Sequence, residues 1–317
     1  MLAPKQRPLC FLASLFLEIM KPDKKFVLVL MFFCAFLVST SFSVGEHITN
    51  NLSSALLTLL RFLIACLLLL PVIWQKYGLS ITLNAFFRYG MISGALVTFF
   101  YCMFVALKYT TAFNTSVLFT LVPLLAGLYA AVLTGERLAK VQLTGLVSAF
   151  IGALLVIFKG NPLLIFEMSW NRGDIIFLLG CLAMGLYTPL VKMLHRGEPM
   201  EQMTFWVLVT GSLWLLPMAG FELKSLQLAQ VGLSTWGWIF YLALFTTVIS
   251  FYLTQFSIPF IGPTRVMAYS YLYPPLVLLI DFISGKGLPE VSVVPGILVI
   301  MVAMVILLQS ARQEERA

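Results

Sequence analysis

The sequence predicts an all-α integral membrane protein whose ten transmembrane helices form a 5+5 inverted-topology repeat. Hydrophobic residues make up 61% of the 317 residues and charged residues only 10%, whereas a soluble domain carries about 25% charged residues. Ten apolar stretches approach the length of about 20 residues that a membrane-spanning helix needs. The second half of the chain also repeats landmarks of the first half in the same order. A chain of this composition requires the lipid bilayer as its solvent.

The ten predicted spans form two groups of five, separated by the longest polar connection. The first group occupies residues 26–47, 53–74, 86–107, 112–134 and 140–158. The second group occupies residues 173–193, 202–220, 235–257, 264–285 and 291–309. The predicted parts of the chain are an N-terminal cytoplasmic segment (1–25), a first repeat (26–158), a linker (159–172), a second repeat (173–309) and a C-terminal cytoplasmic tail (310–317).

Internal similarity supports this division. The stretch FYCMFVALKY, which begins at Phe100, aligns with FYLTQFSIPF, which begins at Phe251, at an offset of 151 residues. The same offset aligns Pro123 with Pro274. In the first two spans of each half, the equivalent residues are instead 146 positions apart. Each half has an odd number of spans, so the two halves must face opposite ways across the membrane. Inverted repeats of this kind occur in secondary transporters, where the substrate site lies near the midplane between the halves.

Basic residues set the predicted orientation. Cytoplasmic loops collect Lys and Arg, and most of the 20 basic residues fall in connections on the same side as the N-terminus. Both termini are therefore expected in the cytoplasm, and the net charge of +7 indicates topology and not a nucleic-acid partner. Residues 9–20 are apolar but too few to span a membrane. We expect residues 1–19 to be dispensable, the alternative being an amphipathic helix on the cytoplasmic face.

Cysteine and histidine usage argues against several chemistries. Four of the five cysteines, at positions 34, 66, 102 and 181, fall inside predicted spans, and the chain has no C-x-x-C pair. A thiol in such a span packs as a small apolar side chain. The chain has two histidines and neither an H-E-x-x-H nor a G-x-G-D motif. We therefore expect no metal, no cofactor and no enzymatic activity.

Residues 106–157, ALKYTTAFNTSVLFTLVPLLAGLYAAVLTGERLAKVQLTGLVSAFIGALLVI, resemble the EamA-type repeat of the drug/metabolite transporter superfamily. The shared features are an Ala-Leu-Lys-Tyr entry, a mid-span proline, a Gly-Glu-Arg turn and a Gly-rich last span. Residues 57–71, with Arg61, look like the second helix of that family. The second half departs from the pattern, because Gly287 and Leu288 replace the Glu-Arg pair of the first half. The resemblance implies ten helices and the movement of small metabolites, often by export.

Polar and aromatic residues at membrane depth are the candidates for substrate contact. Hydroxyls cluster in the first span, and tyrosines recur near one depth in the third, sixth, eighth and ninth spans. Tyrosine joins an apolar ring to a polar tip, although tyrosines also form interfacial belts and hydroxyls also join helices. Asn114 and Arg265 are repeat mates at two span starts, and snorkelling to the interface is the alternative role of Arg265. The predicted substrate-contacting residues are Ser39, Phe42, Tyr101, Asn114, Phe119, Tyr187, Tyr252, Arg265, Tyr269 and Tyr273.

Other residues are candidates for hinges and for ion coupling. Pro123 and Pro274 lie mid-span at matching positions, where a bend either acts as a hinge beside a cavity or only shapes the packing. Glu46 and His47 end the first span, either as a proton-coupling pair or as an ordinary interfacial end. Arg61 lies within a span, where ionisable groups are costly and face polar interiors. It is a candidate for coupling or for binding a carboxylate or phosphate, with a structural hydrogen-bond donor as the alternative.

The sequence favours a secondary transporter that moves a small organic metabolite, an amino acid or a related compound, across a bacterial cytoplasmic membrane. Export by alternating access around a central cavity is expected, and the alternative is a passive channel or a lipid or metabolite facilitator without gradient coupling. The expected partners are the substrate and the bilayer, without nucleic acid. Small residues in the stretch 145–152 predict either a homodimer contact or packing of that span on its own half.

Overall fold

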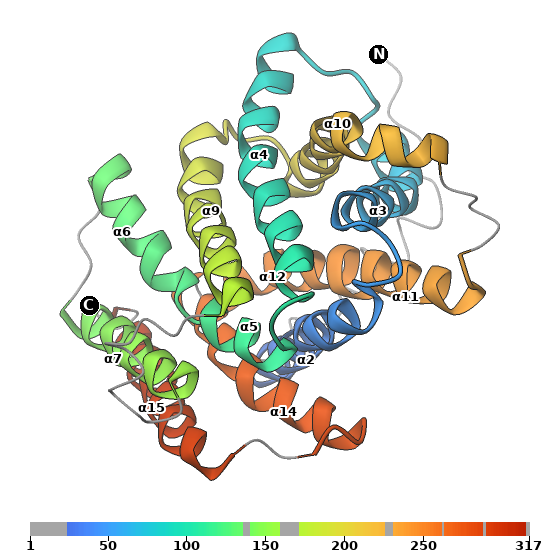
Figure 1. Ribbon diagram of the computed structural model, residues 1–317. Helices are drawn as coiled ribbons and strands as arrows, with labels where there is room; N and C mark the ends of the chain where they lie inside the picture. Colours follow the sequence, from blue (N-terminus) through green and yellow to red (C-terminus); the bar gives the residue numbers. More distant parts are fainter. Residues whose placement is uncertain are drawn as a thin grey trace.

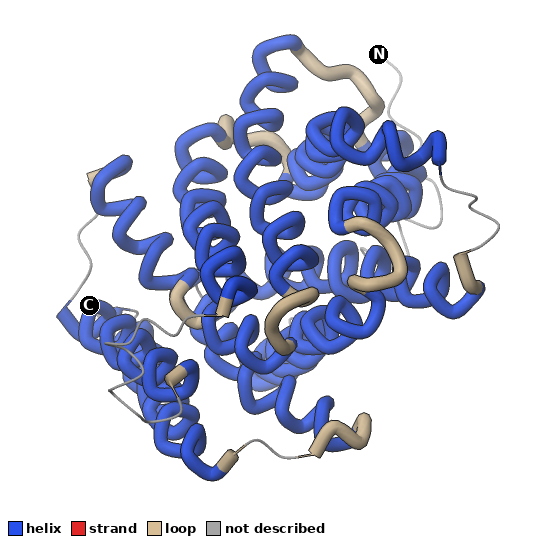
Figure 2. The backbone as a smooth tube through the Cα atoms, viewed as in Figure 1, coloured by secondary structure: helices blue, strands red, loops and turns tan. Residues whose placement is uncertain are grey.

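The computed structural model describes residues 24–135, 140–158, 171–225, 231–261, 263–287 and 290–314, and the regular elements within them are all helical (Figure 2). The first half contains α2 (Lys24–Ile48), α3 (Ser54–Lys76), α4 (Leu83–Ala106), α5 (Ala112–Phe119), α6 (Val122–Thr134) and α7 (Lys140–Ile157). The second half contains α9 (Arg172–Leu194), α10 (Met200–Ser225), α11 (Leu233–Ala243), the π-helix η2 (Leu244–Ile249), α12 (Ser250–Ile261), α13 (Pro263–Ala268), the 3₁₀-helix η3 (Tyr269–Leu272), α14 (Tyr273–Ile283), the 3₁₀-helix η4 (Val291–Val293) and α15 (Val294–Glu314). The expectation for residues 1–19 lies outside the described residues.

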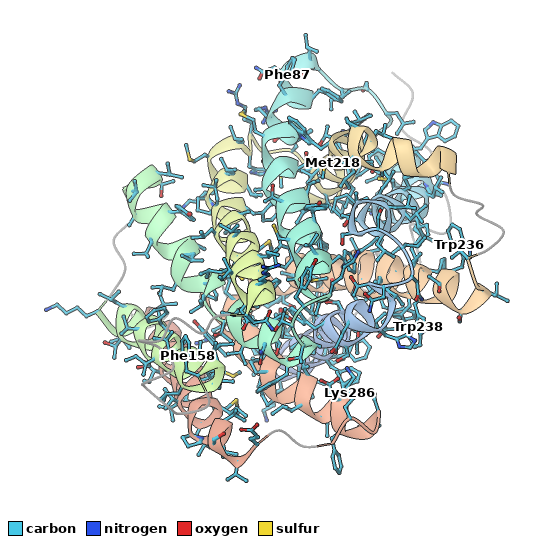
Figure 3. The ribbon with its side chains drawn as sticks, in the orientation of Figure 1. Phe87, Phe158, Met218, Trp236, Trp238 and Lys286 are labelled. Atoms are coloured by element: carbon cyan, nitrogen blue, oxygen red, sulfur yellow. The ribbon has the colours of Figure 1, made fainter. Side chains whose placement is uncertain are left out.

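The helices supply the predicted membrane spans. Eight helical stretches in the described residues are long and apolar enough to cross a membrane. Two shorter apolar helices, Leu143–Ile157 and Val291–Ile306, occupy the fifth and tenth positions. Large apolar side chains such as Phe87, Val132 and Leu298 are exposed, and Figure 3 shows Phe87 at the edge of the protein. A lipid environment stabilises such a surface and water does not. The prediction of an all-helical protein with ten spans is confirmed.

Side-chain caps fix several helix starts. Ser53, Thr82 and Thr111 precede α3, α4 and α5, and each side-chain oxygen accepts from the backbone N–H three residues later. Asn171 caps α9 in a similar way, because its side-chain oxygen accepts a hydrogen bond from the backbone N–H of Gly173. These residues satisfy donors that the first helical turn leaves without partners. The sequence thus defines where successive spans begin.

Helix contacts follow the symmetry of the repeat. Helix α4 of the first half packs on α9 of the second half, and the equivalent pair, α12 of the second half and α2 of the first, also packs together. The helices that are equivalent to one another, α3 with α10 and α7 with α15, pair directly. Figure 1 shows α7 and α15 side by side and α4 next to α9. A pseudo-two-fold axis between the halves accounts for this pattern, as the inverted repeat requires.

The pair of α7 and α15 is joined by very close backbone contact. A Cβ atom built on Gly152 would lie 2.9 Å from the carbonyl oxygen of Gly296, and one built on Gly296 would lie 2.8 Å from that of Gly152. Only residues without a side chain permit such an approach. Gly152, the last of the small residues in the stretch 145–152, therefore packs against α15, a helix of the second half. The span also contacts α5 and α6 of its own half, and a homodimer contact stays a prediction.

The fourth and ninth spans are each broken near the middle. The fourth is divided between α5 and α6 at Thr120 and Leu121, and the ninth passes through η3 before α14. Pro123 and Pro274 each occupy the second position of the helix after the break. A proline is tolerated there because the N–H that it lacks has no partner in a first helical turn. The prolines therefore mark equivalent breaks, while hinge motion at them stays a prediction.

Candidate functional site

A cavity of about 330 Å³ lies between the two halves at the level of the helix breaks. Two ends of the helix bundle can be distinguished: the near end, where α2 begins, and the far end, where α2 finishes and α3 starts. The lining comes from α2, α3, α4, the fourth span, α9, the start of α10, the eighth span and the ninth span. It reaches Met31, Val191 and Met200, which lie toward the near end. The cavity therefore reaches from the middle of the bundle toward the near end.

Equivalent positions of the two halves line this cavity. At the offset of 151 residues, Phe100 and Phe251 both line it. At the offset of 146 residues, Ser41 and Tyr187 both line it. The other lining pairs are Phe99 with Ser250, Met103 with Thr254, Phe119 with Ser270, Val122 with Tyr273, Val38 with Met184 and Phe42 with Thr188. The cavity is thus built around the repeat axis.

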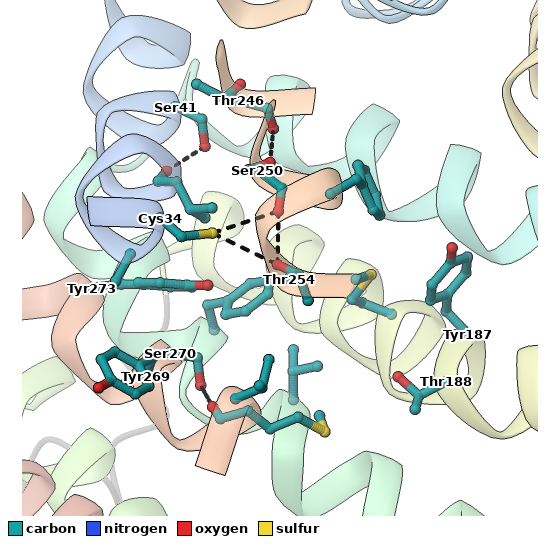
Figure 4. Close-up of a pocket in the computed structure, with 18 of the residues that line it drawn as sticks. Cys34, Ser41, Tyr187, Thr188, Thr246, Ser250, Thr254, Tyr269, Ser270 and Tyr273 are labelled. Atoms are coloured by element: carbon teal, nitrogen blue, oxygen red, sulfur yellow. Dashed lines mark hydrogen bonds between the residues drawn. The ribbon is translucent and has the colours of Figure 1, made fainter. Parts of the chain in front are cut away.

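The eighth and ninth spans contribute a set of hydroxyls that donate to their own helices (Figure 4). Ser250 donates to the carbonyl of Thr246 at 2.9 Å, Thr254 donates to that of Ser250 at 2.8 Å, and Ser270 donates to that of Met267 at 2.8 Å. A hydroxyl has one donor and two acceptor lone pairs. With their protons committed to helix carbonyls, these oxygens are left mainly as acceptors. They suit a ligand that donates hydrogen bonds, such as one with an amino group.

Arg61 of α3 is buried in the wall of the same cavity, with 1% of its surface exposed. Its Nε donates to Thr247 Oγ1 at 2.8 Å, and its Nη2 donates to the carbonyl and hydroxyl oxygens of Thr246 at 3.2 and 3.0 Å. The guanidinium carbon lies 4.2 Å from the centre of the Phe100 ring, which is a cation–π contact. Both threonines belong to η2, the π-helical part of the eighth span. A π-helix displaces carbonyls from the regular α-helical pattern, and here the Thr246 carbonyl accepts from Arg61.

Toward the far end, the cavity is bounded by an aromatic cluster formed by Phe42, Phe99, Phe119, Phe177 and Tyr273. The ring centres of Phe119 and Tyr273 are 5.4 Å apart, those of Phe99 and Phe119 are 5.5 Å apart, and those of Phe42 and Phe119 are 5.9 Å apart. Edge-to-face and tilted aromatic pairs at such distances are attractive. The cluster joins α2, α4 and α9 to the two broken spans. Four of its five rings, those of Phe42, Phe99, Phe119 and Tyr273, line the cavity.

An ion network lies beyond the aromatic cluster at the far end. Lys286 Nζ lies 2.5 Å from Glu46 Oε2 and 3.2 Å from Asp281 Oδ1, and Ser43 donates to Asp281 at 3.0 Å. Burial lowers the pKa of Lys286, but the hydrogen bond to Glu46 and the two carboxylate charges outweigh it and raise the pKa above its ordinary value. Lys286 is labelled in Figure 3. The network ties α2 to the end of α14, and so joins the halves.

A different ion pair lies at the near end. Arg88 of α4 donates to the carbonyl of Leu194 and lies 2.5 Å from Glu198, in the connection between α9 and α10. Burial raises the pKa of Glu198, but hydrogen bonds from Arg88 and from the backbone outweigh it and lower the pKa to about 2. The carboxylate therefore stays charged at physiological pH. This pair fixes the connection to α4 beside the cavity.

The structure brings together five of the ten residues that the sequence predicts to contact substrate. The lining includes Phe42, Phe119, Tyr187, Tyr269 and Tyr273, together with Pro123 and Arg61. Figure 4 shows Tyr187 and Thr188 on α9, across the cavity from Tyr269 and Tyr273.

The other five lie elsewhere. Ser39 donates to the carbonyl of Ala35 at 2.7 Å, and Asn114 donates to Thr110 at 3.3 Å. Tyr101 packs on the hydrophobic core, and Arg265 is buried in α13 outside the cavity lining. Tyr252 lines a second cavity of about 400 Å³, between α3, α10 and the eighth span.

The coupling candidates are also separated. Glu46 belongs to the far-end ion network, whereas the ring of His47 lies 6.0 Å from that of Trp238. Pro274 is buried next to the lining residue Tyr273. Among the described residues, no group of three or more His, Cys, Asp or Glu side chains is placed to hold a metal ion.

Sequence reasoning missed Cys34, Thr246, Ser250, Thr254 and Ser270 as lining residues. The repeat offset carried a usable signal for two of them, because Ser270 is the mate of Phe119 and Ser250 lies next to Phe251, the mate of Phe100. For Cys34 the thiol donates to the carbonyl of Ser250 at 3.5 Å. No sequence pattern indicated that contact, because it depends on how α2 and α12 cross.

The fold and its cavity define a helical membrane protein made of two inverted repeats around a central binding space. The chain belongs to the EamA-like transporter family, whose pattern matches residues 25–158 and again residues 171–309. This is a family of transporters, in agreement with the resemblance found in the sequence.

Relatives with similar sequences are also named as transporters. The chain is 31% identical over 199 residues to YyaM, an uncharacterized transporter of Bacillus subtilis strain 168, with 62% of this chain and 65% of YyaM covered. The matched part is therefore just under two thirds of YyaM. YetK of the same organism, also an uncharacterized transporter, is 27% identical, with 68% of this chain and 67% of YetK covered. A protein of Streptantibioticus cattleyicolor, named a probable terminal-alkyne amino-acid exporter, is 25% identical, with 61% of this chain and 63% of that protein covered.

A solved crystal structure shares the fold. It superposes with a TM-score of 0.67 at 20% sequence identity, and the match covers 90% of this chain and 98% of that chain. At this identity the likeness concerns the arrangement of the helices alone.

Proposed function

We propose that this protein is a secondary transporter that moves a small organic metabolite by alternating access around the central cavity. The observation that carries the proposal is a cavity built from equivalent positions of two inverted halves and bounded toward the far end by the aromatic cluster. Two inverted halves that exchange conformations open one site to each side in turn. In this proposal, a cavity that reaches toward the near end belongs to a state that opens to that side.

An amino acid or a related compound is the proposed substrate, and export is the proposed direction. Support comes from the mixed lining, in which aromatic rings face a small apolar body and hydroxyl oxygens face a donor group. The name of the Streptantibioticus cattleyicolor relative, an amino-acid exporter, is in line with this substrate class. We place the protein in a bacterial cytoplasmic membrane with both termini, and hence the near end, on the cytoplasmic side.

Counterflow in proteoliposomes tests this function. A thermal-shift screen of amino acids and related metabolites on the purified protein supplies the compound. Vesicles preloaded with that compound are expected to accelerate uptake of its labelled form, with a rate that saturates. A flux that rises linearly with concentration and shows no counterflow would identify the alternative, a passive channel or facilitator.

Cysteine labelling tests the orientation. Single cysteines at Lys108 and Lys286 are expected to react with an impermeant reagent added to intact cells, because both follow helices that end at the far end. A cysteine at Gly197, in the connection between α9 and α10, is expected to stay protected. Labelling of Gly197→Cys alone would reverse the proposed topology.

A further inference from the structure

Arg61 has hydrogen-bonding capacity that the protein does not use. Its Nε and Nη2 are held by Thr246 and Thr247, but its buried Nη1 has no hydrogen-bond partner among the described residues. Nη1 carries two N–H donors. A buried donor without an acceptor is costly, and the cost is larger when the group is charged. The arrangement therefore lacks an acceptor on the Nη1 side of the guanidinium.

The described residues also lack a counter-ion for Arg61. None of their Asp or Glu side chains forms an ion pair with it, and it is the one charged residue in the cavity lining that the structure describes. Buried cations are normally paired with an anion. The missing anion thus belongs in a cavity whose other walls are aromatic rings, aliphatic side chains and hydroxyls.

We propose that Arg61 is the anchor for a carboxylate of the transported molecule, which accepts hydrogen bonds from Nη1. This inference rests on the proposed transport function and deepens it by naming the substrate class: a small monocarboxylate with an apolar or aromatic body. Thr246 and Thr247 are positioning residues, because they hold the other two nitrogens and so orient Nη1. A carboxylate fits better than a phosphate, since the described lining supplies a single cation.

The hydroxyls of the second half complete the recognition. Ser250 and Thr254 donate to helix carbonyls, so their oxygens can accept from an amino group on the same ligand. A molecule that carries both groups is held by a cation from the first half and by acceptors from the second half. The site therefore suits α-amino acids and also admits simple carboxylic acids.

Matched acids and amides test the proposal on the purified full chain. The probes are 3-phenylpropionate with 3-phenylpropanamide, and L-phenylalanine with L-phenylalaninamide, titrated by isothermal calorimetry. Each amide keeps the shape of its acid and removes the negative charge. The unmutated protein is expected to bind at least one acid about ten-fold or more tightly than its amide, which is the effect of a charge-assisted hydrogen bond.

Variants locate that preference. Arg61→Gln is expected to abolish the preference for the acid, and Arg61→Lys is expected to keep part of it because a cation remains. Arg88→Gln removes another buried arginine, which lies outside the cavity lining, and is expected to retain the full preference. If Arg61→Gln does not fold, the acid-to-amide comparison on the unmutated chain still decides the question.

Three results would overturn the inference: equal binding of acid and amide, binding of neither acid up to about 10 mM, or an Arg61→Gln variant that keeps the preference. Saturable counterflow of a compound that has no carboxylate would leave the transport function standing and reject the carboxylate site. Conversely, Arg61-dependent binding of an acid without any counterflow would keep the site and reject the transport function.

Discussion

The two halves of the cavity wall have equivalent backbones and different chemistry. Phe99 and Met103 of the first half line the same cavity as Ser250 and Thr254, their mates in the second half. The same change from apolar to hydroxyl-bearing residue separates Phe119 from Ser270. Helix packing fixes where the backbones lie. At a cavity surface, where no neighbouring helix is in contact, the same backbone position accommodates either an apolar or a hydroxyl-bearing side chain. At these three positions the side chain is apolar in the first half and carries a hydroxyl in the second.

Arg61, the one charged residue that the structure describes in the cavity lining, shows the same asymmetry. Arg61 in α3 corresponds to Val207 in α10, and the π-helix that holds Arg61 corresponds to residues 93–98 within the continuous helix α4. A guanidinium needs displaced carbonyl and hydroxyl acceptors, whereas valine needs none. The charge lies in the first half and the irregular turn that holds it lies in the second, and neither has a counterpart at the equivalent position of the other half.

The symmetric join between the halves is the place where a small change should have the largest effect. Gly296→Ala would place its Cβ 2.8 Å from the Gly152 carbonyl oxygen, where only backbone movement relieves the clash. Overpacking of this kind costs about 1–3 kcal/mol, so we expect a clear fall in Tm in detergent. Gly90→Ala is the matched control, because nothing lies within 4 Å of its added Cβ. An unchanged Tm for Gly296→Ala would contradict the close helix contact.

Making the two walls alike should reduce substrate binding. Thr254→Met gives the second half the residue that its mate, Met103, has in the first, and removes an acceptor. If that acceptor holds a charged amino group, KM should rise about ten-fold while expression and Tm are kept. Thr98→Met is the control, since Thr98 is exposed and lies outside the lining. Equal KM values for the two variants would show that wall polarity does not select the substrate.

The equivalent helix breaks should affect turnover more than stability. Pro123→Ala supplies an N–H that can reach the Phe119 carbonyl, and Pro274→Ala supplies one that can reach that of Ser270. Each change favours a continuous helix, so transport should slow several-fold at constant expression. Pro71→Ala, within the continuous helix α3, is the control for loss of a proline. Normal turnover in both break variants would limit the two prolines to shaping the packing.

The far-end ion network should give the smallest effect on stability. Lys286 is 44% exposed, and ion pairs with this exposure contribute about 0–1 kcal/mol. Because its folded pKa is raised, its contribution is fully present below the unfolded pKa of about 10.4 and is lost as pH rises through the folded value. The Tm difference between the unmutated protein and Lys286→Met should be constant from about pH 6 to 9 and vanish in stronger alkali. A difference that instead disappears near pH 6 would assign the effect to another group.

That network also sharpens the comparison of the halves. The position equivalent to Lys286 in the first half is Gly135, so the same latch cannot form at the near end. There, Arg88 holds Glu198 through a contact of different origin. The two ends of the bundle therefore carry ion pairs of unlike origin.

The sequence by itself determined the membrane spans, the duplication and the positions of the helix breaks. These follow from one-dimensional properties: the length of an apolar stretch, the spacing of matched residues, and a proline that lacks an N–H. Pro123 and Pro274 could be placed at equivalent breaks because each acts on its own backbone. The caps at Ser53 and Thr82 are local in the same way.

Only the tertiary structure decided which face of each span meets the cavity. Phe251 lines the central cavity and its neighbour Tyr252 lines only the second one, while Tyr101, next to Phe100, packs on the core. A span that is apolar on every side gives no periodic signal of which face points inward. The rotation of each helix about its axis decides which side chains face lipid and which face the cavity, and composition does not reveal it. The unpaired Nη1 of Arg61 likewise became apparent only from the structure, in which Thr246 and Thr247 of η2 accept hydrogen bonds from the other two nitrogens.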